Sequence, residues 1–174
     1  NDDAVYEEIR YEGYGPGSIA IIIDVLTDNR NRTASEIRSN FNKNGGSMGE
    51  AGSLSFVFTR KGVIKFSAEQ CSEDKFFELA AEAGAEDISS DMIEHTAICI
   101  VEDFGNVRDS ITLKIGDPTS AKLEWVPQNL QSINEEQAEK LLKFIDILED
   151  NDDVQTVYSN AEISDEVMEK INNN

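Results

Sequence analysis

Residues 19–26 read Ile-Ala-Ile-Ile-Ile-Asp-Val-Leu, a nearly continuous run of apolar and mostly β-branched side chains. A run of this length is typical of a buried β-strand. Before it, Gly13–Gly17 contains three glycines and one proline and predicts a tight turn. The polar residues Tyr6–Tyr11 alternate in the manner of a strand. Together these segments predict an antiparallel hairpin over residues 5–26.

A helix is predicted directly after this strand. Thr33 and Glu36 have capping-box spacing, in which each side chain satisfies a backbone N–H group at the helix start. Apolar residues then recur at steps of three and four, and the glycine pair at 45–46 is suited to end the helix. Leu54–Thr59 follows as a predicted strand, with Phe56 on its apolar face.

Residues 62–126 alternate between strand and helix patterns in the order β-α-β-β-α-β. The predicted elements are a strand at 63–66, a helix between Ser72 and Gly84, strands at 86–89 and 96–101, a helix from Phe104 to Gly116, and a strand at 121–126. This order is the signature of a ferredoxin-like domain.

The most regular helical pattern comes last. Asn134 and Gln137 have capping-box spacing, an apolar stripe follows, and Val154–Tyr158 is a final strand. The first sheet has only one helix to cover it, so residues 134–160 are expected to add a second helix and a fourth strand. We therefore predict an α+β protein with two small α/β-sandwich domains and mostly antiparallel sheets. Residues 1–61 plus 127–174 form a discontinuous domain, and residues 62–126 form the inserted one.

The charge of the chain is strongly uneven. The net charge is −20, yet residues 27–66 hold seven basic and three acidic residues and are net +4. The basic ones are Arg30, Arg32, Arg38, Lys43, Arg60, Lys61 and Lys65. Such asymmetry points to a surface that faces nucleic acid or the ribosome. The alternative is an ordinary solvated basic face.

No motif in the sequence predicts catalysis, a metal or a cofactor. His95 is the only histidine, and we interpret it as a surface residue at a strand edge. Cys99 is expected to be buried, and Cys71 lies at a helix start, where a thiol pKa is slightly lowered. Neither cysteine has the spacing of a zinc site. The acidic run 149–153 lacks the pattern of a calcium loop and is read as a solvated helix end.

The three spaced glycines at 13, 15 and 17 precede a strand and not a helix, so a dinucleotide site is not predicted either. No apolar run approaches the roughly 20 residues that span a bilayer, so no membrane partner is expected. Two cysteines without a disulfide framework suit a reducing compartment, and we expect a cytoplasmic protein.

The segment Thr27–Thr33, Thr-Asp-Asn-Arg-Asn-Arg-Thr, is unusually rich in hydrogen-bond donors. It joins the buried strand to the predicted helix, whose N-terminal N–H groups favour phosphate. In the alternative interpretation, Asp28 pairs with an arginine and the asparagines stabilise turns.

This segment and Tyr6–Gly17, together with stretches such as 83–87 and 148–154, resemble the YebC/PmpR family over nearly the whole chain. The resemblance implies a non-catalytic regulator of gene expression, and a further basic, helical domain N-terminal to these residues. The family is commonly described as probable DNA-binding transcriptional regulators. Other members, including the mitochondrial translational activator of cytochrome oxidase, act in translation.

We therefore expect a contact with ribosomal RNA, tRNA or the ribosome, and a contact with promoter DNA is the main alternative. The residues predicted to make it are Tyr14, Asn29, Arg30, Asn31, Arg32, Arg38, Lys43, Arg60, Lys61 and Lys65. Two further alternatives are an enzyme with an acidic cleft and a protein-binding module that uses the acidic face of Asn134–Asp150. Nothing in the sequence predicts an oligomeric state.

Overall fold

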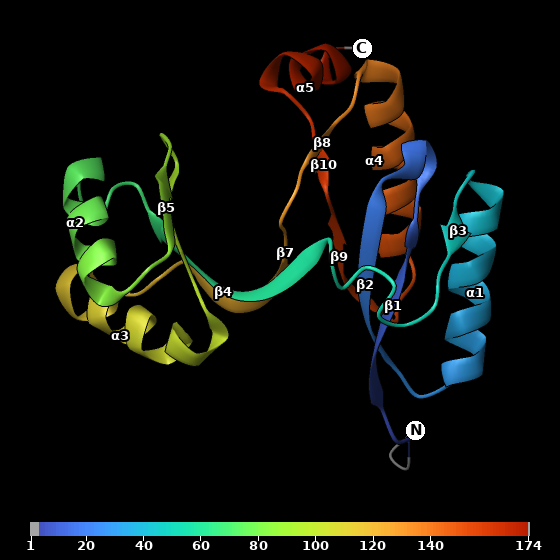
Figure 1. Cartoon of the computed structure of the whole chain (residues 1–174), viewed down its shortest axis with the longest axis horizontal. Coiled ribbons are helices and arrows are strands. Elements are labelled where there is room, and N and C mark those ends of the chain that lie inside the picture. The colour runs from blue at the N-terminus through green and yellow to red at the C-terminus, as the bar shows by residue number, and fades with distance from the viewer. Residues whose placement is uncertain (1–3, 174) are drawn as a thin grey trace. The chain divides into compact units, whose positions relative to one another are not determined.

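The computed structural model describes residues 4–173, and Figure 1 shows its elements. The chain forms two compact units. One contains the residues up to Thr59 and those from Pro127 onward, and the other is Arg60–Val126. Each unit is built on its own four-stranded sheet with antiparallel strand pairs. The predicted α+β class with two small α/β domains is confirmed.

The sheet of the first unit has the strand order β3-β1-β2-β9. Its strands are β1 (Glu7–Tyr14), β2 (Ala20–Thr27), β3 (Ser47–Met48) and β9 (Val154–Ser159). A single 3₁₀ turn, η1 (Pro16–Ser18), connects β1 to β2, and these strands pair antiparallel over their full length. The hairpin predicted for residues 5–26 is therefore present.

Two helices cover the same face of this sheet. Side chains at alternate positions of β2, such as Ile21 and Ile23, form one buried cluster with residues of α1 (Arg30–Lys43) and α4 (Glu135–Glu149). Alternation along a strand places these isoleucines on one face. Phe41 of α1 and Phe144 of α4 meet edge to face with ring centres 5.0 Å apart. The predicted capping box at Asn134 is present at the start of α4.

The opposite face of the sheet is covered partly by a loop. Glu12 pairs with Ile22 and lies on that face, where its side chain is only 1% exposed. The backbone N–H groups of Gly52 and Leu54 donate to its carboxylate at 2.6 and 2.9 Å.

These two hydrogen bonds hold part of the segment that was predicted to be a strand over residues 54–59. The prediction was wrong over residues 54–57, which form turns, whereas residues 58 and 59 do belong to a strand, β4 (Phe58–Ser67). Gly52 adopts a φ of +86°, which is not a strand conformation. Phe56, predicted to face a core, is 86% exposed.

Two short strands and a terminal helix complete the first unit. β8 (Gln131–Ser132) and β10 (Ala161–Glu162) pair in parallel. The helix α5 (Asp165–Asn172) was not predicted from the sequence. It is capped by Ser164, whose side chain accepts from the N–H of Val167, and it packs partly buried apolar residues against the main core.

The second unit has the strand order β5-β6-β4-β7, which is that of a ferredoxin-like sheet. After β4, its elements are α2 (Glu73–Ala83), β5 (Asp87–Ser90), β6 (Glu94–Cys99), η2 (Val101–Asp103), α3 (Phe104–Ile115) and β7 (Ser120–Pro127). Ser72 caps α2 and Gly84 ends it in the left-handed conformation, as predicted. Gly116 ends α3.

His95 is not the surface residue that was predicted. It lies on a central strand, is 2% exposed and stacks on Phe76 with ring centres 4.8 Å apart. Its ring nitrogens lie 2.7 Å from the Ser90 hydroxyl and 2.8 Å from the Cys71 carbonyl oxygen. Both ring nitrogens thus have partners within the second unit, as buried polar groups generally do.

The predicted direction of the Cys71 pKa shift was also wrong. Burial raises the pKa of its thiol, and this outweighs the opposing effect of Lys75. Cys99 is fully buried, as predicted, and burial raises its pKa too. A raised pKa disfavours the thiolate, which is the nucleophilic form of cysteine.

Candidate nucleic-acid interface

The N-cap of α1 lies four residues earlier than the sequence predicts. Asn29 is the N-cap, and its side-chain oxygen accepts a hydrogen bond of 3.1 Å from the N–H of Arg32. The capping box predicted at Thr33 is wrong, because Thr33 is buried within the helix and its hydroxyl bonds elsewhere. Arg30 and Arg32 therefore lie in the first helical turn and not in a connecting loop.

Asp153, just before β9, organises this helix start. The Thr33 hydroxyl donates to its carboxylate at 2.7 Å, and an N–H of Arg32 donates at 3.0 Å. The Thr27 hydroxyl lies 2.8 Å from that of Thr33 and accepts from the Asn29 N–H at 3.0 Å. The hydrogen bond from Thr33, followed by the contribution of Arg32, lowers the pKa of Asp153. The donor-rich segment is thus partly an internal hydrogen-bond network.

The two arginines of this segment are paired with carboxylates but remain in solvent. Arg32 lies within 4 Å of three carboxylates, those of Asp28, Glu36 and Asp153. Arg30 forms an exposed ion pair of 3.3 Å with Glu7. Their side chains are 46% and 63% exposed, respectively. An anion can reach both groups, but it has to compete with these pairs.

The C-terminal half of α1 is different. Arg38 and Lys43 are exposed, and neither forms an ion pair with a carboxylate anywhere in residues 4–173. Arg38 lies seven residues after Asn31, so both occupy one flank of the helix. Lys43 lies eleven residues after Arg32, on the other flank. The cations of α1 thus border its exposed face on both sides.

Tyr14 lies at the other end of the helix from Arg30. It ends β1, pairs with Ser47 and is 43% exposed. A Cβ at Gly46, just past α1, would collide with the Tyr14 carbonyl oxygen, so the tyrosine adjoins the helix C-terminus. Fourteen residues of α-helix span about 21 Å, which is the approximate separation of the two ends.

Three of the predicted residues belong to the second unit and have partners there. Lys61 pairs with Glu86 at 2.6 Å, and Lys65 pairs with Glu94 at 3.3 Å. The Arg60 guanidinium lies over the Trp125 ring, 5.0 Å from its centre. Seven of the predicted residues therefore lie on or beside α1, and the other three belong to the second unit.

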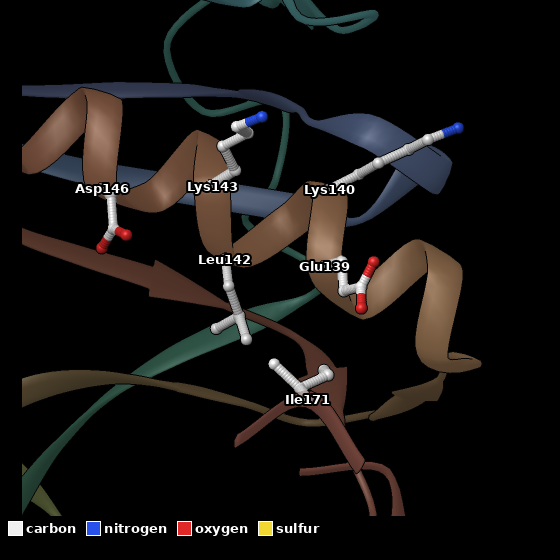
Figure 2. A pocket seen from close by; sticks show the side chains of 6 residues that line it. All are labelled: Glu139, Lys140, Leu142, Lys143, Asp146 and Ile171. Atoms are coloured by element: carbon white, nitrogen blue, oxygen red, sulfur yellow. The ribbon is translucent and has the colours of Figure 1, made fainter. Parts of the chain in front are cut away.

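The described surface also has an open groove of about 410 Å³ between α4 and α5. Figure 2 shows the Leu142 and Ile171 side chains turned toward each other, with Lys140 and Lys143 pointing away from them. Glu139 and Asp146 complete its lining. A groove with two apolar side chains and charges of both signs has no convergent polar groups of the kind that hold a substrate.

A smaller hollow beside Arg32 is lined by Glu36 and residues 150–153 and is mainly acidic. Within residues 4–173 there is no cluster of three histidine, cysteine or carboxylate side chains arranged to hold a metal ion. The same residues contain no helix that is long and apolar enough to cross a membrane.

Comparison with known proteins identifies the family of this chain. The sequence model described as the TACO1/YebC second and third domain matches residues 6–161. The chain belongs to the TACO1/YebC family. This confirms the resemblance found in the sequence. The family is labelled as one of transcription regulators and is not a known enzyme family.

A solved structure of similar fold is that of a conserved hypothetical protein, Aq1575, from Aquifex aeolicus. It is 38% identical in sequence and superposes with a TM-score of 0.87. The match covers 95% of this TACO1/YebC chain and 68% of that protein.

Two residues that shape the surface were missed in the sequence. Asp153 holds the start of α1 from 120 residues away, and Glu12 holds the loop that contains Phe56. For Asp153, the sequence contains no signal, since it stands in an acidic run that reads as solvated. For Glu12, the sequence did contain a signal. A carboxylate at an alternating position of a strand that pairs with the isoleucine run indicates a buried charge that needs hydrogen-bond donors.

Proposed function

We propose that this TACO1/YebC chain is a non-catalytic regulator of gene expression that acts in translation, by contact with the ribosome or its RNA. Arg38 and Lys43 make the principal phosphate contacts, and Arg30 and Arg32 add weaker ones. The observation that carries the proposal is a pair of exposed cations without carboxylate partners within residues 4–173, on one helix of a strongly acidic molecule. Exposed cations that border one helix face, against a negative background, mark a surface for a polyanion.

The way α1 packs favours RNA or the ribosome over the major groove of duplex DNA. Thr33, Ile37 and Phe41 are fully buried along one side, so the helix lies flush on its sheet over its whole length. A groove-reading helix has to project from its domain and present base-contacting side chains. Here the cations border the exposed face, and the carboxylate of Glu36 lies beside Arg32. Such a surface suits phosphates, not base edges.

Binding of promoter DNA is the second candidate function, because the family carries a transcription-regulator label. The two are separated by ribosome co-sedimentation and a promoter-DNA gel shift on the natural full-length protein at the same salt concentration. We expect co-sedimentation with ribosomes at concentrations where duplex DNA is not retarded. Retardation of DNA without co-sedimentation would reverse the assignment.

The same assays test the residues. Arg38→Glu/Lys43→Glu reverses two charges on α1, and Arg108→Glu/Lys114→Glu is the matched control on α3 of the second unit. Each pair replaces one arginine and one lysine, so the net charge of both variants is identical. We expect the α1 variant to lose ribosome binding and the α3 variant to retain it. Equal loss in both variants would mean that only net charge matters.

A further inference from the structure

Phe56 is the most exposed aromatic side chain among the described residues. It is 86% exposed and lies between β3 and β4, in the segment that passes close to β1 in Figure 1. Its neighbours Ser53 and Ser55 are also exposed, whereas Leu54 is fully buried. The ring adds nothing to the buried core and is accessible to a partner.

The loop that carries Phe56 is firmly anchored. The Glu12 carboxylate accepts from Gly52 and Leu54, and the Glu12 carbonyl accepts from the N–H of Gly49 at 2.8 Å. The N–H of Val57 then donates to the Leu54 carbonyl at 2.9 Å and closes the turn that presents Phe56. A buried carboxylate that accepts two backbone hydrogen bonds fixes a loop strongly. The backbone that carries the ring is therefore held in a defined place, which lowers the entropic cost of ordering the loop on binding.

The surroundings of the ring indicate what it binds. Residues 49–57 contain one charged residue, Glu50, and mostly glycine, alanine and serine beside the aromatic ring. Protein-binding hot spots join several large apolar side chains in a packed patch, which this loop does not provide. A single accessible ring with small hydroxyl-bearing neighbours suits a flat base, which stacks on the ring and hydrogen-bonds to nearby donors.

We propose that Phe56 is a stacking platform for an unpaired nucleobase, and that Glu12 is the positioning residue that holds it in place. The inference rests on the proposed function, since it supplies a base contact to a protein whose α1 cations contact phosphates. The Phe56 contact differs from the contacts of the α1 cations, because stacking requires a base, whereas charge pairing requires only a phosphate.

The test measures binding of full-length protein to labelled oligoadenylate of about ten nucleotides and to an abasic ribose-phosphate oligomer of equal length. Phe56→Ala is expected to weaken oligoadenylate binding roughly 5- to 150-fold, the range for removing one stacked base, and to leave abasic binding unchanged. Phe77→Ala, which removes another exposed ring in the second unit, is the matched control and should have no effect. In Phe56→Trp, binding should persist and quench the added indole fluorescence.

The outcomes separate this inference from the function on which it rests. If Arg38→Gln/Lys43→Gln weakens oligoadenylate binding but Phe56→Ala does not, only the stacking role is overturned. If wild type does not bind oligoadenylate, or if neither variant changes its binding, the stacking role is overturned, and ribosome co-sedimentation of Arg38→Glu/Lys43→Glu then decides the proposed function alone. If Phe56→Ala weakens ribosome co-sedimentation without affecting oligoadenylate, the ring contacts a ribosomal protein and the base-stacking proposal is overturned.

Discussion

Each half of α1 carries two basic side chains, but in the described part of the chain only those in the first half are paired with carboxylates. In the first turn, Arg30 and Arg32 are paired with four carboxylates, from Glu7, Asp28, Glu36 and Asp153. In the last two turns, Arg38 and Lys43 have no carboxylate partner within residues 4–173.

The contrast teaches that a basic run in a sequence is not yet a basic surface. Thr27–Thr33 is the most distinctive segment of the chain, but its structural role is to join α1 to β9 through Asp153. The plainer residues further along the helix are the better-placed phosphate contacts. Exposed ion pairs contribute only about 0–1 kcal/mol, so the paired arginines are weakened as contacts but not removed.

The largest expected effect is on the paired end of the helix. Asp153→Ala removes the acceptor of the buried Thr33 hydroxyl and should lower the free energy of unfolding by about 2 kcal/mol. Urea denaturation measures this decrease. Asp152→Ala is the matched control, because Asp152 is exposed and should change stability by less than about 0.5 kcal/mol. Equal stability of the two variants would mean that Asp153 does not anchor the helix.

Low pH should abolish the difference in unfolding free energy between wild type and Asp153→Ala. The pKa of Asp153 is lowered in the folded protein, so its stabilisation is present above the unfolded-state value of about 3.9. It disappears as the pH falls through the lower folded-state pKa. The stability gap between wild type and Asp153→Ala should therefore stay constant from pH 7 to about 5 and narrow below about 4. Denaturation curves across this range measure it, and a gap that widens in acid contradicts the assignment.

Neutral substitutions should distinguish the two halves of the helix in binding. Removing two phosphate contacts to a single strand costs roughly 25-fold in affinity at 0.1 M salt, which we expect for Arg38→Gln/Lys43→Gln. Arg30→Gln/Arg32→Gln should cost only roughly fivefold, because these arginines must first leave their carboxylates. Fluorescence anisotropy with a labelled RNA gives both values. A larger loss of affinity in Arg30→Gln/Arg32→Gln would indicate that the main phosphate contact is made by the donor-rich segment Thr27–Thr33.

The smallest effect is expected in the second unit. Lys61 and Lys65 are paired with Glu86 and Glu94, so Lys61→Gln/Lys65→Gln should change RNA affinity by less than about twofold. The same anisotropy titration measures it. A decrease as large as that of the Arg38 and Lys43 variant would show that the second unit extends the contact surface.

The sequence predicted the elements that depend on local patterns. The isoleucine run indicated a buried strand, and Ser72, Gly84 and Asn134 were placed correctly as helix caps. These features depend on residues three or four positions apart, or on alternation along one strand.

The predictions that were wrong concern residues with distant partners. The Thr33 hydroxyl was assigned to a cap but bonds Asp153, and residues 54–57 were assigned to a strand but are held by Glu12. His95 was assigned to the surface but fills the space beside Phe76. In each case a hydrogen bond or ring contact across many residues overrides the local pattern, and spacing in one sequence does not reveal it.

The salt dependence of RNA binding tests most directly whether the unpaired cations of α1 meet phosphates. Each phosphate of a single strand that a cation neutralises steepens the slope of log affinity against log salt by about 0.7. Arg38→Gln/Lys43→Gln should therefore reduce the slope by about 1.4 relative to wild type, and Arg108→Gln/Lys114→Gln should leave it unchanged. A wild-type slope in the Arg38 and Lys43 variant would show that neither side chain meets a phosphate and would contradict the proposed interface.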